Sequence, residues 1–183
     1  MRTSTQNLEN DHIYVLKLID VMRALTTSGS TDAGHIESII DIIRNFADGL
    51  HHAKEEELFF PALEKKGFSA QQGPVAVMLH EHIQGRNFVK GMTENLDQYR
   101  NGNKEALKGV YQNMNGYADL LVNHISKENN ILFRMADKVL SDEEQKRLLE
   151  SFEGIEQNRK EGMQVTDYIE RINGLALFYK VEN

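Results

Sequence analysis

The stretch "LHHAKEEELFFPAL", from Leu50 to Leu63, holds the residues from which the fold can be inferred. It places two adjacent histidines four residues ahead of two glutamates and ends in an aromatic pair and a proline. In an α-helix, residues i and i+4 lie on one face, so the spacing His-x-x-x-Glu stacks an imidazole above a carboxylate. Two such pairs overlap here, His51 with Glu55 and His52 with Glu56.

The residues around each pair indicate which of them faces the core. Going back from His51 by threes and fours gives Ala47, Ile43 and Ile40, and going forward from Glu55 gives Leu58 and Ala62, so this face is apolar. The same steps back from His52 reach the polar residues Asp48 and Asn45. We therefore expect His51 and Glu55 to point inward, and His52 and Glu56 to lie at the edge of the core or in solvent.

The opening stretch has a partner later in the chain. "HHAKEEELFF" (residues 51–60) is matched by "HISKENNILF" (residues 124–133), which shares the histidine, the lysine, the first glutamate and the final phenylalanine. Asp11-His12-Ile13 and Glu81-His82-Ile83 form a second matched pair with nearly the same separation along the chain. The two halves of the chain thus resemble two helical hairpins related by a pseudo-two-fold axis.

Apolar residues at helical spacing run through most of the chain. They predict helices over residues 5–27, 33–65, 74–100, 104–140 and 163–180, with a further helix opened by Ser141. Thr31 or Asp32 suits an N-cap, Pro74 suits a first helical turn, and Ser141 with Glu144 resembles a capping box. The prediction is an all-α single domain, an up-down-up-down four-helix bundle over residues 5–140 with additional C-terminal helices over 141–183.

Inward-facing histidines and glutamates come from all four predicted bundle helices. His12 lies between Leu8 and Val15, and His82 between Met78 and Val89, whereas His124 and Glu128 continue a stripe that leads to Ile131 and Met135. His80 shares a more polar face and is expected to be exposed or to support the site from outside.

A lone inward histidine is usually a hydrogen-bonded core residue, and a buried carboxylate is costly unless it is paired or bound to a metal. Six such residues in matched repeats favour a metal site. Its predicted ligands are His12, His51, Glu55, His82, His124 and Glu128.

Composition narrows the range of partners. The 183 residues include 28 acidic and 21 basic side chains, a net charge of −7, which argues against nucleic acid and against an anionic membrane surface. The sequence shows neither an apolar run long enough to span a bilayer nor a secretory signal at its start, so we expect a soluble cytoplasmic protein. Because the sequence contains no cysteine, nitrogen and oxygen atoms must hold any metal.

The stretches "ENDH", "HHAKEEELFFPAL", "MLHEHIQGR" and "NHISKENNILF" resemble the motifs of the hemerythrin-like, HHE cation-binding proteins over about residues 8–140. The resemblance implies a four-helix bundle around a non-haem centre of two iron ions, joined by an oxo or hydroxo bridge. The six residues above would be its ligands, with both glutamates bridging the irons. The same donor atoms also suit manganese and zinc.

One departure from the family pattern concerns the third helix. Oxygen-carrying hemerythrins supply a fifth histidine there, four residues from another, whereas Met78 and Arg86 stand at those positions beside His82. Four histidines, two bridging carboxylates and one bridge leave an open position on each of two octahedral metals. Such a site suits dioxygen, nitric oxide or peroxide touching both metals better than it suits reversible oxygen carriage.

The resemblance implies that the protein handles such small ligands in sensing, scavenging or a stress response. The alternatives are a di-iron enzyme that reduces nitric oxide, decomposes peroxide or repairs iron centres, and a protein for iron storage or delivery. The four-histidine, two-glutamate subgroup is linked to repair of iron centres, and its usual N-terminal cysteine-bearing segment has no counterpart in this sequence. The physiological ligand, a redox partner and the oligomeric state are not identified by the sequence.

Overall fold

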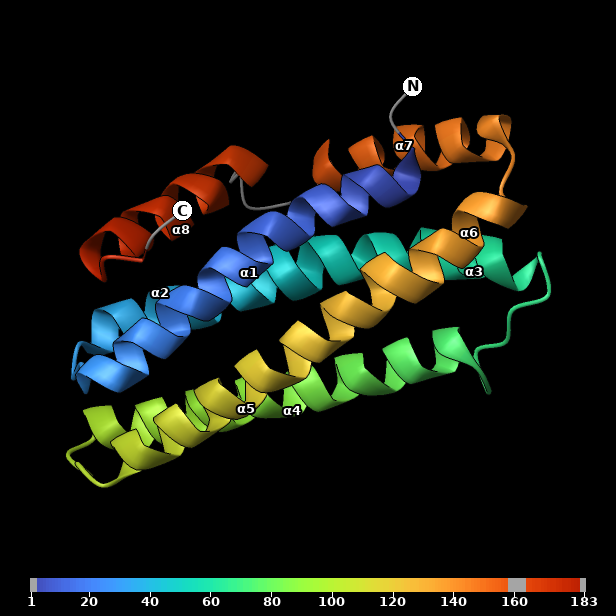
Figure 1. Cartoon of the computed structure of the whole chain (residues 1–183). Coiled ribbons are helices and arrows are strands. Elements are labelled where there is room, and N and C mark those ends of the chain that lie inside the picture. The colour runs from blue at the N-terminus through green and yellow to red at the C-terminus, as the bar shows by residue number, and fades with distance from the viewer. Residues whose placement is uncertain (1–2, 158–163, 182–183) are drawn as a thin grey trace.

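A computed structural model describes residues 3–157 and 164–181. These residues form helices joined by loops, and four helical legs make up an antiparallel bundle (Figure 1). The first leg is α1 (Ser4–Ser28) and the third is α4 (Pro74–Arg100). The second leg runs through α2 (Ala33–Ile42), η1 (Ile43–His52), η2 (Glu55–Phe59) and α3 (Phe60–Glu64). The fourth leg runs through α5 (Ala106–Lys127), η3 (Glu128–Leu132) and α6 (Phe133–Val139).

The packing of the four legs closes the bundle. Helix α4 packs against α5, α5 packs against α1, and α2 packs against α4, while η1 contacts both α1 and α4. The predicted all-α, up-down-up-down bundle is therefore confirmed.

Local sequence signals set where the helices begin. The Asp32 side chain accepts hydrogen bonds from the backbone N–H groups of Gly34 and His35, so Asp32 is the N-cap of α2. Pro74 occupies the first turn of α4, where its missing N–H leaves no hydrogen bond unmade. The Ser141 hydroxyl accepts from the Glu144 backbone N–H, and the Glu144 carboxylate accepts in return from the Ser141 backbone N–H, at the start of α7.

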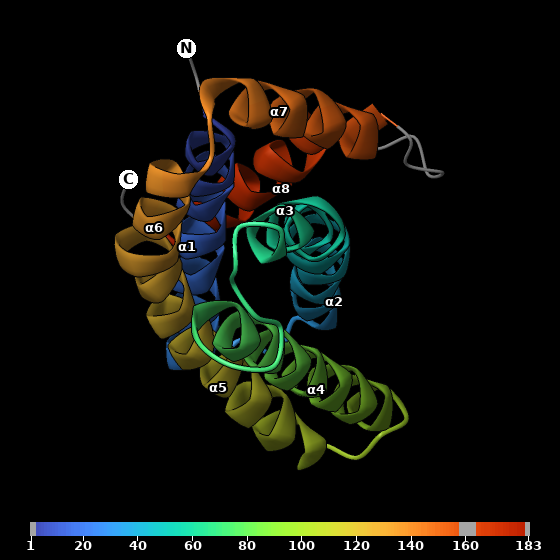
Figure 2. The ribbon, with the colours of Figure 1, turned by 90° about the vertical axis from the view of Figure 1, so that its right-hand side faces the viewer.

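Two further helices lie outside the bundle. Helix α7 (Asp142–Gln157) packs against α1 and η2, and α8 (Val165–Phe178) packs against α1 and α2 (Figure 2). The predicted start of the last helix, Met163, falls outside the described residues, and its described part begins at Val165. The organisation of the chain as a single domain stays a prediction.

The second and fourth legs contain π-helical segments, η1, η2 and η3, in which backbone hydrogen bonds join residues i and i+5. Each π-helical turn holds more residues than an α-helical turn, so the buried face shifts along the sequence. The expectation that Ile131 and Met135 continue the core stripe is wrong for this reason, because both are exposed. Leu58 and Ala62 do pack against the core, but they are only partly buried. The buried residues are the next ones in sequence, Phe59, Leu63, Leu132 and Ala136.

Two hydrophobic clusters fill the interior and leave a polar layer between them. One cluster includes Val15, Phe46 and Val89, and the other includes Leu8 and Met78. On α1, His12 lies between Leu8 and Val15, and on α4, His82 lies between Met78 and Val89. The apolar clusters therefore enclose the histidines from both ends of the bundle.

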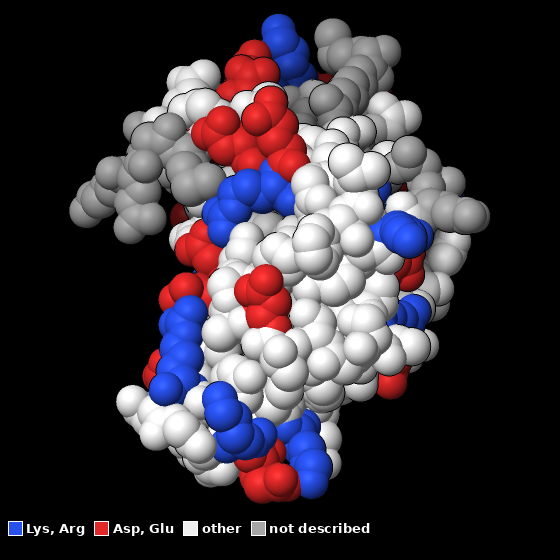
Figure 3. Space-filling model, turned by 90° about the vertical axis from the view of Figure 1, so that its left-hand side faces the viewer, with Lys and Arg blue, Asp and Glu red and all other residues white. Residues whose placement is uncertain are grey.

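Figure 3 shows the end of the molecule that includes the C-terminal part of α8. Both acidic and basic side chains lie on the surface of this end. Uncharged side chains cover a broad area of this face, and charged ones lie mainly around its margins. Leu177 and Phe178 of α8 are exposed. Across the described residues, we find no helix with the length and apolarity that crossing a membrane requires.

Candidate metal centre

All six residues predicted as ligands are buried in the layer between the hydrophobic clusters. Together with His52, these residues form two groups that share Glu55. Within each group, one nitrogen or oxygen atom of every residue lies within 4.8 Å of those of the others. The groups are His12, His51, Glu55 and Glu128, and His52, Glu55, His82 and His124. The structure thus brings the six residues together, and their role as metal ligands stays a prediction.

The histidines form two pairs, one from each half of the chain. In the first pair, the Nε2 atoms of His12 and His51 lie 2.9 Å apart, and in the second pair those of His82 and His124 lie 3.2 Å apart. The first pair comes from α1 and η1, and the second from α4 and α5. Each helical hairpin therefore supplies one pair of imidazoles.

The two glutamates stand between the histidine pairs. Glu55 Oε1 lies 3.7 Å from His51 Nε2, and Glu55 Oε2 lies 3.5 Å from His82 Nε2. Glu128 Oε2 lies 3.2 Å from the Nε2 atoms of both His12 and His124. Each carboxylate thus faces one histidine of each pair, as a bridging ligand requires.

Every histidine of the two pairs donates its Nδ1–H outward. The acceptor of His12 is Asn129 Oδ1 at 2.7 Å and that of His51 is Asp11 Oδ2 at 3.4 Å. The Nδ1–H of His82 points to Glu56 Oε1 at 2.7 Å, and that of His124 points to Glu81 Oε2 at 3.0 Å. Such acceptors fix the tautomer and leave the Nε2 lone pair free, as in histidines that bind metals.

Where both histidines of a pair are neutral, these hydrogen bonds leave their Nε2 lone pairs facing each other. Burial and the neighbouring His12 lower the pKa of His51 to about 3, so His51 remains neutral near pH 7. Two facing lone pairs repel unless a positive charge lies between them. The geometry therefore calls for a proton or a cation between the imidazoles.

The two glutamates also call for a positive charge beside them. The four carboxylate oxygens of Glu55 and Glu128 are buried and have no hydrogen-bond partner among the described residues. Burial, together with the charge of Glu128, raises the pKa of Glu55 well above its ordinary value. Unpartnered buried carboxylates are costly, and a bound cation removes that cost.

The second pair shows what the site does without a metal. Burial opposes protonation of His124, but the negative charges of Glu128 and Glu81 outweigh it and raise the pKa of His124 to about 9. The surroundings of His124 therefore favour a positive charge at this position. Nitrogen and oxygen donors, unpartnered carboxylates and outward-anchored imidazoles together fit a transition-metal ion.

The groups that anchor the histidines follow the internal repeat, although sequence reasoning did not select them. Asp11 and Glu81 each precede a histidine in the matched motifs and accept from His51 and His124. The matched lysines complete the pattern, because Lys54 Nζ lies 2.9 Å from Asp11 Oδ2 and Lys127 pairs with Glu81. The shared Asp/Glu-His and Lys positions were the signal that could have identified these residues.

His52 is where the sequence-based expectation is wrong. The sequence pattern predicts it at the edge of the core or in solvent, yet it is only 3% exposed and belongs to the second group. The reason is the π-helical geometry of η1, which separates adjacent residues by a smaller angle than an α-helix does. Glu56 is only partly buried, at the edge of the core, as expected.

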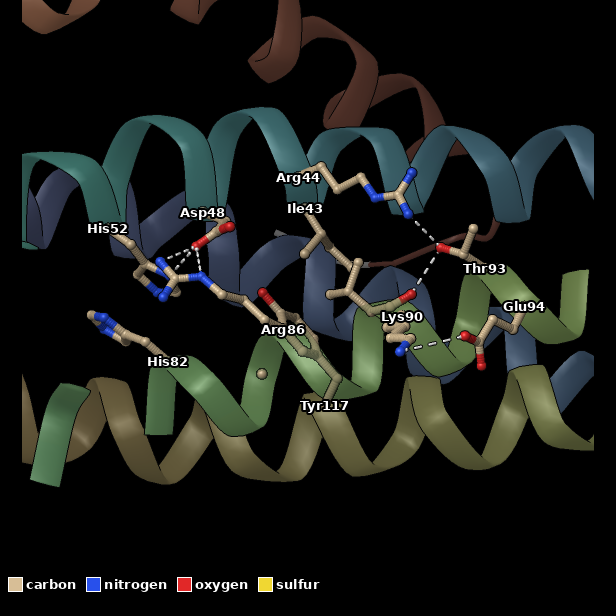
Figure 4. A pocket seen from close by; sticks show the side chains of 12 residues that line it. Ile43, Arg44, Asp48, His52, His82, Arg86, Lys90, Thr93, Glu94 and Tyr117 are labelled. Carbon is tan, nitrogen blue, oxygen red and sulfur yellow. Dashed lines mark hydrogen bonds and ion pairs between the residues drawn. The ribbon is translucent and has the colours of Figure 1, made fainter. Parts of the chain in front are cut away.

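A pocket of about 410 Å³ leads from the surface to the second pair (Figure 4). His52 and His82 form its inner end, and Ile43, Gly85 and Val89 are among its apolar walls. The Tyr117 side chain reaches into it from α5, and its buried hydroxyl has no hydrogen-bond partner within the described part of the chain. The pocket therefore offers a small ligand a path to the histidines along apolar and charged walls, with the unpartnered Tyr117 hydroxyl as a hydrogen-bond donor within it.

Comparison with known proteins identifies a family and several relatives. The model of the hemerythrin HHE cation-binding domain matches residues 3–136. The iron-sulfur cluster repair protein YtfE of Escherichia coli O157:H7 is 32% identical over 88 residues, and that of Enterobacter sp. (strain 638) is 34% identical over 89 residues. Each match covers 47% of this chain and 40% of the relative, so the chain spans well under half the length of these relatives. No solved structure matches the chain.

Proposed function

Because the chain belongs to the hemerythrin HHE cation-binding family, we propose that it binds two iron ions between its histidine pairs and handles a small ligand there. The observation that carries this proposal is the set of four unpartnered, buried carboxylate oxygens facing four imidazole Nε2 atoms. His12 and His51 would hold one ion, His82 and His124 the other, and Glu55 and Glu128 would bridge them. Manganese or zinc could occupy the same donors.

The bound ions would supply electrons and open coordination positions for dioxygen, nitric oxide or peroxide. The protein's own contribution is the surrounding pocket, where Ile43 and Val89 give the path to the second pair part of its apolar wall. The Tyr117 hydroxyl is placed to donate a hydrogen bond to a ligand in the pocket. This arrangement supports a role in sensing or scavenging such ligands under stress.

Metal analysis tests the proposal. The protein is loaded with ferrous iron without oxygen, desalted and assayed for iron per chain and for its absorption spectrum after oxidation. We expect two irons per chain and the absorption of a bridged pair. A chain that stays free of metal after this treatment would contradict the proposal.

A second candidate function is repair of iron centres, favoured by the relatives named as iron-sulfur cluster repair proteins. The test is transfer of iron from the loaded protein to a cluster protein damaged with nitric oxide. Recovery of the cluster would support repair. Rapid binding of nitric oxide with all iron retained would support the sensing or scavenging role. Steady formation of nitrous oxide from nitric oxide, or of dioxygen from peroxide, would establish that the protein is an enzyme.

A substitution in the wall of the pocket should slow the access of a ligand to the metals without changing the amount of metal bound. Val89→Phe adds an aromatic ring to the pocket wall, so ligand binding to the iron-loaded protein should slow several-fold while the iron content stays at the wild-type level. Stopped-flow mixing with nitric oxide measures the rate. Val77→Phe is the matched control, because Val77 is exposed on the same helix. Equal rates in the two variants would show that the ligand uses another path.

A further inference from the structure

Three matched positions of the site carry a polar residue in one half and an apolar residue in the other. Alignment of His51 with His124 places Ile125 opposite His52 and Leu121 opposite Asp48, and alignment of His12 with His82 places Leu16 opposite Arg86. His52, Asp48 and Arg86 form one connected polar set, whereas all three counterparts are apolar. The polar set therefore exists beside the second histidine pair and has no equivalent beside the first.

The polar set anchors His52 in the way the other site histidines are anchored. His52 Nδ1 donates to Asp48 Oδ1 at 3.2 Å, which leaves its Nε2 lone pair free. The ring of His52 stacks on that of His82 with centroids 3.7 Å apart. One of its ring nitrogens lies within 4.8 Å of ligand atoms of Glu55, His82 and His124.

Arg86 ties this arrangement to the second pair itself. Its Nε donates to Asp48 Oδ1 at 2.9 Å, and its Nη2 donates to Glu56 Oε1 at 2.8 Å. Asp48, which lies between His52 and Arg86 in Figure 4, anchors His52, and Glu56 anchors His82. One guanidinium therefore holds the acceptors of both stacked imidazoles. A buried histidine that served only packing would need neither the free nitrogen nor this support.

We propose that His52 is a fifth histidine ligand, which gives the metal at the second pair three imidazoles and the metal at the first pair two. The proposal rests on the two-metal site proposed above. It makes the two metal positions chemically unequal, and it supplies from the second leg the histidine that the third helix lacks. His52 also lines the pocket, so the metal position with three imidazoles is the one beside the ligand path.

The test uses the full chain loaded with iron-57 and read by Mössbauer spectroscopy, with chelator challenge as a second readout. The wild type should give two distinct quadrupole doublets of equal area. His52→Ile installs the residue found at the matched position of the other half. In this variant one doublet should change and the other stay, and one of the two irons should leave to a chelator at least ~10-fold faster.

Two further variants secure the assignment. His52→Gly with added imidazole should restore the changed doublet, because free imidazole can occupy the vacated position. His80→Ile is the matched control, since His80 is exposed and its side chain is hydrogen-bonded to Gln84, outside the site. Its spectrum and iron release should equal those of the wild type.

The possible failures are distinguishable. A wild type that takes up no pair of metals would overturn the proposed function together with this inference. A wild type with two irons whose spectrum and chelator release are unchanged by His52→Ile would overturn the fifth ligand alone. A His52→Ile variant that keeps its spectrum and changes only its rate of nitric oxide binding would assign His52 to the pocket, and would overturn its role as a ligand.

Discussion

Replacing Glu55 with glutamine should abolish binding of the metal pair and at the same time stabilise the metal-free protein. The two oxygens of Glu55 face one histidine of each pair, so the loss of its charge weakens both metal positions. Without metal, the same carboxylate is buried beside Glu128 and lacks a hydrogen-bond partner among the described residues. Glutamine can donate to Glu128 or to an imidazole, which should raise the free energy of unfolding by about 1–3 kcal/mol.

The measurements are iron per chain after loading and urea unfolding of the metal-free protein. Glu57→Gln is the matched control, because Glu57 is exposed in the same π-helical segment and should change neither quantity. Glu128→Gln should lose the metal pair as Glu55→Gln does. If Glu55→Gln kept both irons, Glu55 would not be a bridging ligand.

Metal loading should stabilise the wild-type chain strongly. A ligand that binds only the folded state adds about 4 kcal/mol to the free energy of unfolding when its concentration is a thousand times its dissociation constant. The two hydrophobic clusters on either side of the site should keep the metal-free chain folded, so both forms can be compared. Thermal unfolding of the loaded and chelator-treated protein measures the difference.

Glu55→Gln and Glu57→Gln give the contrast for this prediction as well. The first should lose the stabilisation by iron, and the second should retain it. A wild type whose unfolding is unaffected by iron would mean that the ion binds weakly or binds the unfolded chain equally well. Addition of magnesium, which prefers an all-oxygen environment, should have little effect in either variant.

Much of the fold could be predicted from the sequence because its signals are local. Asp32, Pro74 and the Ser141–Glu144 pair act within one turn of the backbone, and each begins a helix where expected. The convergence of the six site residues could be predicted because the internal repeat marks equivalent positions in both halves. Periodicity and repetition were sufficient for these features.

What could not be predicted depends on hydrogen bonding that the periodic pattern does not encode. The assumption of one α-helical period fails at the π-helical segments, where it puts His52 at the edge of the core and selects Leu58 in place of Phe59. The sequence pattern did not indicate that Lys54 is buried, because a lysine is rarely buried unless acidic side chains pair with it. Those partners, Asp11 and Glu156, come from α1 and α7, which are distant in sequence.

The repeat also constrains how such a site can diversify. In a symmetric dimer of identical hairpins, any substitution would appear twice and would alter both metal positions at once. A single chain that contains both hairpins removes this restriction, because each copy can accumulate its own changes. His52 and Asp48 of the first hairpin correspond to Ile125 and Leu121 of the second, and Arg86 of the second hairpin corresponds to Leu16 of the first. These differences are such independent changes. Gene duplication and fusion of a hairpin would thus let one metal position specialise while the other keeps the simpler set of ligands.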